Sequence, residues 1–243
     1  MQLYYIRHAE SENNRLWAET GSGDGRSPDP HLTALGHRQA RRLAEFIRDA
    51  GEGVPQEAFD LQNVHGFGFT HLYCSLMVRA VETALPLAHA LDLPLVGWKD
   101  LHEGGGIFLV EEREKEEKTF VGLPGRSRSY FEAHYPELRL PEDLGEEGWW
   151  NRPFETREER PLRARRVLHT LLERHGGTED RVALISHGGF YNHLLRAVLD
   201  MPDSADHWLV MNNVAITRID FLPETINVVY TNRLDYLPSD MIT

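Results

Sequence analysis

Short apolar segments of high β propensity alternate along this chain with longer segments in which apolar residues recur at helical spacing. Strands that alternate with helices indicate a mostly parallel α/β sheet, because a parallel pair needs a crossover connection that a helix usually supplies. We expect a three-layer αβα fold, closed at one edge by an antiparallel pair near the end of the chain. The expected strands are residues 3–6, 71–75, 93–96, 181–186, 214–221 and 226–231, and the expected helices are residues 34–50, 76–91, 161–175 and 190–199.

One long stretch, residues 104–159, breaks this pattern. Gly, Pro, charged residues and scattered aromatic residues follow one another there without a sustained period. No Pro/Gly/Ser-rich linker divides the 243 residues into two self-sufficient halves. We therefore expect a single domain over residues 1–243, in which residues 104–159 form a large insertion or lid between the third strand and the later helix.

The composition excludes several classes of partner. The formal net charge is -12, and an acidic chain without a Lys/Arg-rich block repels nucleic acid and anionic membranes. No segment approaches the roughly 20 apolar residues of a membrane-spanning helix, and the first apolar run ends at Arg7, too early for a signal peptide. Cys74 is the only cysteine, so no intrachain disulfide can form. We expect a soluble, cytoplasmic protein with no nucleic-acid or membrane partner.

The 13 histidines do not form a metal-binding pattern. Zinc sites are marked by His-x-x-x-His pairs on a helix or by clusters of Cys and His, and the sequence has neither. We therefore expect no metal and no other cofactor.

The sharpest local feature is Arg7-His8-Ala9-Glu10-Ser11, which directly follows the first expected strand. Ligands of open α/β sheets bind beyond the carboxyl ends of the strands, so His8 and its Arg neighbour lie where a substrate would be held. A second Arg-His pair, in Arg174-His175-Gly176-Gly177, ends a charged helix, and its glycines indicate a helix end and a turn. The position after a strand, and not the dipeptide, makes His8 the candidate.

Two further strand ends carry matching chemistry. Ser186-His187-Gly188-Gly189 follows an apolar strand, and its glycines let the backbone approach a bound anion. Arg79 lies near the start of the helix that follows residues 71–75. If the three strands are neighbours, these groups meet His8 and Arg7, and two guanidinium groups can make bidentate contacts to phosphate oxygens. Phosphoryl transfer requires a nucleophile beside positive charge of this kind.

These segments and several others resemble, in the same order along nearly the whole chain, the motifs of the histidine phosphatase superfamily, also called the phosphoglycerate mutase-like proteins. Arg7–Ser11 is similar to the Arg-His-Gly-Glu motif, with Ala9 in place of the usual Gly. Residues 104–159 are the part that the resemblance explains least. The other matching segments are Asn14, Leu32–Gly36 with Gln39-Ala40, Ser75–Ala84, Leu101-His102-Glu103, His187-Gly188 and Asn212–Ile216.

The resemblance implies a phosphohistidine mechanism. His8 would be the nucleophile, and Glu103 would protonate the leaving oxygen and later take a proton from the attacking water. The residues that would bind phosphate are Arg7, Asn14, Thr20, Arg79, His187 and Gly188, of which Arg7, Arg79 and His187 would also offset charge in the transition state.

Other carboxyl groups lie close to Glu103 in the sequence, namely Asp100, Glu111 and Glu112. We favour Glu103 because the glycines at 104–106 permit close backbone approach and because the flanking pattern matches the family.

Three functions are compatible with these residues. The first is a phosphomonoesterase that acts on a small phosphorylated metabolite, and the second is a phosphoglycerate mutase, which returns the phosphoryl group to substrate instead of to water. The third is a non-catalytic phosphate-binding or scaffold protein, against which the retained catalytic set argues. The substrate is not named by the sequence, and a homo-oligomer is compatible with it. In the insertion, Arg126, Arg128, Trp149 and Trp150 are candidates for substrate contact or for packing.

Overall fold

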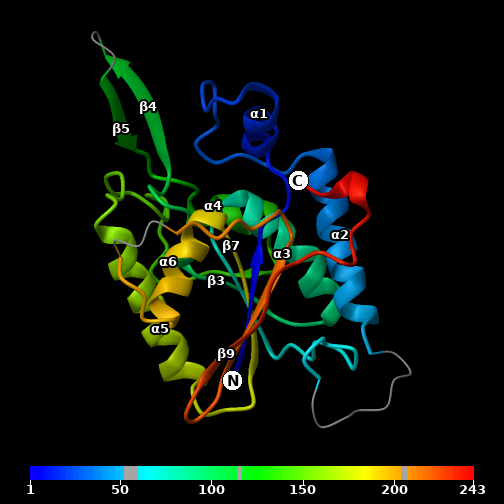
Figure 1. The fold of residues 1–243 in the computed structure, drawn as a ribbon. Helices are drawn as coiled ribbons and strands as arrows, with labels where there is room; N and C mark the ends of the chain where they lie inside the picture. Colours follow the sequence, from blue (N-terminus) through cyan, green and yellow to red (C-terminus); the bar gives the residue numbers. More distant parts are fainter. Residues whose placement is uncertain (52–59, 114–116, 204–206) are drawn as a thin grey trace.

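The computed structural model describes residues 1–51, 60–113, 117–203 and 207–243, and within them a mostly parallel sheet forms the centre of the molecule (Figure 1). The strands from β6 to β1 pair in parallel, and β8 and β9 extend the sheet as antiparallel strands. The expected antiparallel pair is thereby confirmed. In spatial order the strands are β6 (Leu138–Arg139), β3 (Leu95–Gly97), β2 (His71–Cys74), β7 (Arg181–Ser186), β1 (Gln2–Arg7), β8 (Ile216–Phe221) and β9 (Ile226–Arg233).

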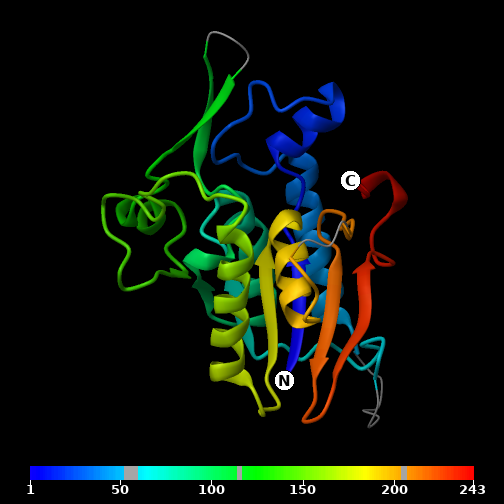
Figure 2. The ribbon, with the colours of Figure 1, turned by 60° about the vertical axis from the view of Figure 1, so that its left-hand side comes forward.

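Two pairs of helices cover the two faces of this sheet (Figure 2). The first face carries α2 (Ala34–Asp49) and α3 (Val78–Leu91), and the second carries α5 (Glu159–His175) and α6 (Gly188–Val198). Alternate side chains of β1 enter the two cores, Tyr4 and Ile6 on the first face and Leu3 and Tyr5 on the second. A strand covered on both faces reads as a continuous apolar run. The three-layer αβα fold is confirmed.

The helix ends follow the local sequence signals. The Thr33 hydroxyl accepts a hydrogen bond from the Gly36 N–H at 3.0 Å and so caps α2. The glycines after α5 form its end, as the sequence predicts, with Gly177 at φ +73°. No helix of the described residues is long and apolar enough to cross a membrane.

Residues 104–159, for which the sequence predicts no regular structure, contain a β-hairpin, a helix and one strand of the main sheet. The hairpin consists of β4 (Phe108–Arg113) and β5 (Glu117–Gly122), and it projects from the body of the molecule (Figures 1 and 2). Leu109 and Phe120 on the hairpin are 41% and 44% exposed, so no deep core imposes an alternating pattern on it. The helix α4 (Arg128–His134) is short, and β6 adds only two residues to the sheet.

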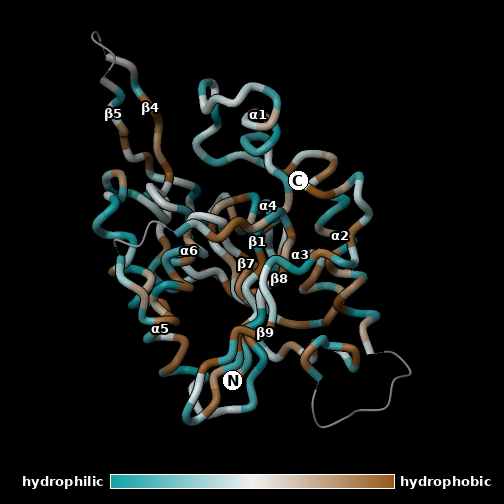
Figure 3. The backbone as a smooth tube through the Cα atoms, viewed as in Figure 1, coloured by the Kyte–Doolittle hydropathy of each residue, from teal (hydrophilic) through white to brown (hydrophobic). Residues whose placement is uncertain are grey.

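α1 (Glu12–Thr20) is a second element that the hydrophobic pattern does not predict. It has no buried residue and therefore no apolar stripe. Figure 3 shows hydrophobic residues gathered in the central strands, whereas α1 is largely hydrophilic. Ser11 begins the helix through a capping box with Asn14.

The strands β2, β7 and β1 are neighbours and run in the same direction. Arg7 is the register partner of Ser186, and Cys74 is the partner of Ile185. The three strands therefore end at one edge of the sheet, and the side chains that follow them meet there. The sequence predicts that the three motifs meet only if these strands are neighbours, and in the structure they are.

Candidate active site

His8 follows β1 directly and is held by its neighbours in the sheet. Its backbone N–H donates to the Ser186 carbonyl at 2.9 Å, and the side chain is buried. The ring Nδ1 lies 2.7 Å from the Ala9 carbonyl oxygen. A carbonyl can only accept, so Nδ1 carries the proton and Nε2 has the lone pair. Arg79 donates from Nε to this Nε2 at 3.1 Å.

His187 faces His8 from the end of β7, with ring centroids 5.1 Å apart. Both ring nitrogens of His187 are buried and have no hydrogen-bond partner among the described residues. The Tyr5 hydroxyl donates to the His187 carbonyl at 2.7 Å and accepts from its N–H at 3.1 Å, which fixes the backbone. The His187 ring, with its unpartnered nitrogens, therefore lies beside the His8 ring on a fixed backbone.

The two arginines add buried positive charge to this space. Arg7 donates from Nη1 to the Met211 carbonyl, and its buried Nε has no partner within the described residues. Leaving a buried donor unpaired costs about 1–3 kcal/mol, and a bound anion would satisfy it. Burial lowers the pKa of Arg7 and of Arg79 from the usual value, but a guanidinium remains charged in a protein.

Burial and positive neighbours keep both imidazoles neutral. Burial, followed by the charges of Arg79 and Arg7, lowers the pKa of His8 well below its usual value. Burial and then Arg79 lower the pKa of His187 in the same way. At neutral pH the Nε2 of His8 therefore carries a lone pair and no proton, and this lone pair accepts the hydrogen bond from Arg79.

Glu103 reaches the same place from the loop after the short helix η1 (Lys99–Leu101). Its Oε2 accepts from the Gly189 N–H at 3.0 Å, and its Oε1 accepts from the Gly104 N–H at 2.8 Å. A Cβ atom at Gly189 would overlap this carboxylate, so the contact needs glycine there. Of the other carboxyl groups considered, Glu111 is exposed on β4, and the side chain of Glu112 lies outside the described residues.

The remaining predicted phosphate ligands differ in their placement. Gly188 packs against Arg7, whose Nε would lie 3.4 Å from an added Cβ. The Asn14 Oδ1 accepts from Asn213, which also donates to the His8 carbonyl at 2.8 Å, so Asn14 borders the cluster. Thr20 is exposed at the end of α1, and its hydroxyl donates to a carbonyl of its own helix. Thr20 is not joined to His8 by the contacts of the described residues, and its role stays a prediction.

The four residues singled out in the insertion mostly hold its structure. Arg128 donates to the carbonyls of Leu144 and Pro141. Trp149 and Trp150 are each 4% exposed and lie in the core. Three buried nitrogens of this group have no hydrogen-bond partner among the described residues, namely Nε of Arg126 and the indole Nε1 of Trp149 and of Trp150.

Arg26 is a further candidate site residue, which was not predicted from the sequence. Its guanidinium stacks on the ring of Phe108 at 4.2 Å, and its buried Nη1 is without a hydrogen-bond partner in the described part of the chain. It lies close enough to Arg79 and Glu103 for their charges to act on its pKa, which burial lowers. Arg26 stands in a loop without hydrophobic period, so no pattern marks it.

The motif around Gly36 holds the loop after His8. A Cβ atom at Gly36 would overlap the Glu10 carbonyl oxygen, and only glycine leaves room for this approach. Gln39 accepts from the Glu10 N–H at 2.7 Å, and Thr33 donates to the Glu10 carboxylate at 2.5 Å. These residues therefore hold the Glu10 segment of the loop that follows His8.

A separate group of possible metal ligands lies at the opposite edge of the sheet. It consists of His71, His175 and Asp180, close to the starts of β2 and β7. The two ring nitrogens of His175 already face Asp180 at 2.8 Å and the Tyr73 hydroxyl at 3.1 Å. The group therefore has an internal structural explanation and is remote from His8.

Comparison of the sequence with known protein families identifies the class of protein to which this chain belongs. The sequence model of the histidine phosphatase superfamily (branch 1) matches residues 3–233, and the chain belongs to that family. The sequence-based recognition is confirmed. The family includes enzymes that transfer phosphoryl groups.

Individual relatives are distant. The chain is 27% identical over 221 residues to the probable phosphoglycerate mutase GpmB of Yersinia enterocolitica, covering 91% of this chain and 85% of that one. The fold is similar to that of phosphoserine phosphatase from Entamoeba histolytica in complex with 3-phosphoglyceric acid, with TM-score 0.60, 21% identity and coverage of 98% and 99%. A mycobacterial glucosyl-3-phosphoglycerate phosphatase has TM-score 0.53, 20% identity and coverage of 90% and 89%.

Proposed function

We propose that this protein is a phosphomonoesterase that hydrolyses a small phosphorylated metabolite through a phosphohistidine on His8. One observation carries the proposal. A neutral, buried imidazole, whose Nε2 accepts from Arg79, lies beside His187, and buried nitrogens of its neighbour Arg7 and of His187 have no partner among the described residues. Together these residues provide a nucleophile and donors suited to three equatorial phosphoryl oxygens.

In the first step, Nε2 of His8 attacks phosphorus and the bond from phosphorus to the ester oxygen breaks. Arg79 shifts its hydrogen bond from Nε2 to a phosphoryl oxygen, and Arg7 and His187 bind the others. Glu103, protonated for this step, gives its proton to the leaving oxygen. The alcohol departs, and the phosphoryl group remains on Nε2.

In the second step, water attacks phosphorus and the bond from phosphorus to Nε2 breaks. Glu103, now a carboxylate, takes the proton of that water. His8 regains its lone pair and inorganic phosphate leaves. The hydrogen bond from Nδ1 to the Ala9 carbonyl at 2.7 Å keeps the ring in one tautomer through both steps.

The second candidate function is that of a mutase, which is favoured by the name of the bacterial relative. A mutase must keep water from its phosphohistidine and must bind a second acidic group of its substrate. Arg128, one of two candidates for that binding in the insertion, instead donates to carbonyls of the insertion itself. Of the two, Arg126 is left for that binding, and hydrolysis is the function that we favour.

The choice between the two is tested by giving the enzyme 3-phosphoglycerate with catalytic 2,3-bisphosphoglycerate in excess EDTA. We expect phosphate release from 3-phosphoglycerate or from other members of a panel of phosphomonoesters, without accumulation of 2-phosphoglycerate. EDTA has no effect on the expected result because Arg and His supply the positive charge. Many turnovers to 2-phosphoglycerate for each phosphate released would establish the mutase instead, and loss of activity restored by a divalent ion would contradict the metal-free mechanism.

A further inference from the structure

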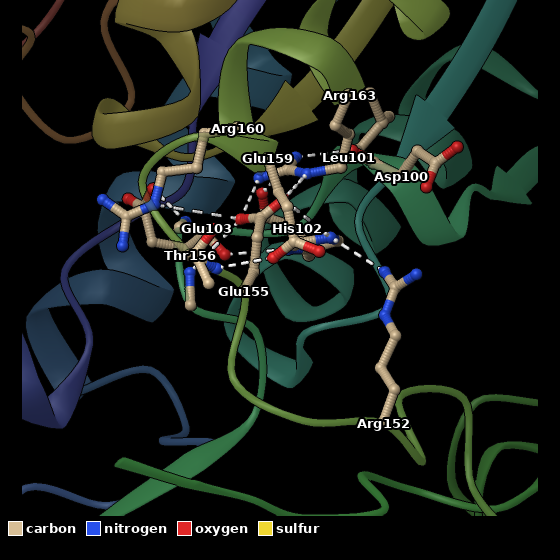
Figure 4. A network of polar contacts seen from close by, with 12 residues as sticks. Asp100, Leu101, His102, Glu103, Arg152, Glu155, Thr156, Glu159, Arg160 and Arg163 are labelled. Atoms are coloured by element: carbon tan, nitrogen blue, oxygen red, sulfur yellow. Dashed lines mark hydrogen bonds and ion pairs between the residues drawn. The ribbon is translucent and has the colours of Figure 1, made fainter. Parts of the chain in front are cut away.

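A buried ion pair holds the loop that carries Glu103 (Figure 4). Arg163 of α5 is 1% exposed and donates to Glu155 through two parallel hydrogen bonds, from Nε at 2.6 Å and from Nη2 at 2.9 Å. Its remaining nitrogen, Nη1, donates to the carbonyls of Asp100 and His102 at 2.8 and 2.9 Å. One guanidinium thus binds the end of the insertion and the loop immediately before Glu103.

Glu155 also binds the same loop on the C-terminal side of Glu103. Its backbone N–H donates to the Gly105 carbonyl at 3.2 Å, and its Oε2 accepts from the Gly105 N–H at 3.3 Å. Contacts to Asp100, His102 and Gly105 therefore bracket Glu103 from both directions. The positive φ of Gly105, +90°, gives the loop the turn that this approach requires.

His102 completes the support from inside. It is fully buried, and Arg152 lies 3.2 Å from its Nε2. An arginine can only donate, so Nε2 accepts, and the proton on Nδ1 is directed to the Glu103 carbonyl at 2.8 Å. Burial, followed by the charge of Arg163, lowers the pKa of His102 well below its usual value, so the His102 imidazole is neutral.

We propose that the Arg163–Glu155 pair positions Glu103 for proton transfer. The packing of the end of the insertion against α5 then fixes the place of the Glu103 carboxyl group. The inference rests on the proposed function, because it concerns the acid of that mechanism. Neither residue touches the substrate. Both act through the loop, whose carboxylate reaches the Gly189 N–H at 3.0 Å. A displacement of about 1 Å in such a group can cost about 10²-fold in rate.

The test measures kcat/KM on p-nitrophenyl phosphate, whose leaving group needs little protonation, and on glycerol 2-phosphate, whose alkoxide needs it. The leaving-group ratio is the first value divided by the second. Glu155→Gln keeps the size of the side chain and removes its charge, and we expect it to raise the ratio about tenfold or more. Arg163→Lys keeps the charge without the planar fork and should act in the same direction. Thermal unfolding confirms that each variant is folded.

Arg165→Met is the matched control. Arg165 lies on α5 as Arg163 does, but its ion pair, with Asp203, is exposed. The substitution should leave the leaving-group ratio at the wild-type value. In a Glu103→Gln background, adding Glu155→Gln should not raise the ratio further, because the group that it positions is already gone.

The outcomes separate the inference from the proposed function. If Glu103→Gln raises the ratio while folded Glu155→Gln and Arg163→Lys slow both substrates equally, the pair has only a structural role and the inference is overturned. A further rise in the double variant would overturn it too. If Glu103→Gln itself leaves the ratio unchanged, the acid is wrongly assigned, and the inference fails together with that part of the mechanism.

Discussion

His8→Ala is expected to lower kcat/KM by at least about 10³-fold while the protein remains folded. The nucleophile must approach phosphorus in line at about 3 Å. The nearest imidazole, His187, has its ring centroid 5.1 Å from that of His8 and stands on a different strand end. Because His187 is fixed by Tyr5, it cannot move into the vacated position.

His175→Gln is the matched control, because His175 is also a buried histidine but lies at the opposite edge of the sheet. It loses contacts to Tyr73 and Asp180 and should lower the temperature of unfolding while keeping kcat/KM. Steady-state kinetics and thermal unfolding of both variants make the comparison. Activity within tenfold of wild type in folded His8→Ala would remove His8 from the mechanism.

Glu103→Gln is expected to slow glycerol 2-phosphate by about 10²- to 10⁴-fold, the usual contribution of a general acid. The loss on p-nitrophenyl phosphate should be much smaller in kcat/KM, because nitrophenolate leaves without a proton. Glutamine keeps one oxygen that can accept from the Gly189 N–H, as Glu103 does at 3.0 Å, and loses only the acceptor for the Gly104 N–H of its own loop, so thermal unfolding should show the variant folded.

The comparison of the two substrates is the measurement that tests this assignment. Equal losses on both would show that Glu103 acts through structure alone. In that event the acid would have to be sought among the other carboxyl groups close in sequence, Asp100, Glu111 and Glu112.

The layers of the fold could be predicted because burial dictates pattern. β1 is covered on both faces, so Leu3 to Ile6 form an uninterrupted apolar run, whereas α2 buries one stripe and shows helical period. The hairpin β4–β5 and α1 bury little, and no pattern records them. The contacts that they make are local, among them the capping box of α1 and the stacking of Arg26 on Phe108.

The candidate site was predictable in its chemistry but not in its geometry. The order of strands in the sheet does not follow their order in the sequence, and the convergence of His8, His187 and Arg79 depends on β7 lying between β1 and β2. Arg163 left a partial signal, because it shares the buried face of α5 with Val167 and Leu171 at intervals of four residues. That spacing marks a buried charge, but nothing local identifies Glu155 as its partner.

The central claim, a phosphohistidine on His8, is tested most directly by trapping it. Glu103→Gln with p-nitrophenyl phosphate should form the phosphoenzyme readily and hydrolyse it slowly, because only the second step needs the missing base. Mixing should release one nitrophenolate per enzyme in a burst, and an alkaline quench followed by peptide mass spectrometry should place the phosphoryl group on His8. A burst with the group on another residue, or turnover with neither burst nor phosphoenzyme, would contradict the mechanism.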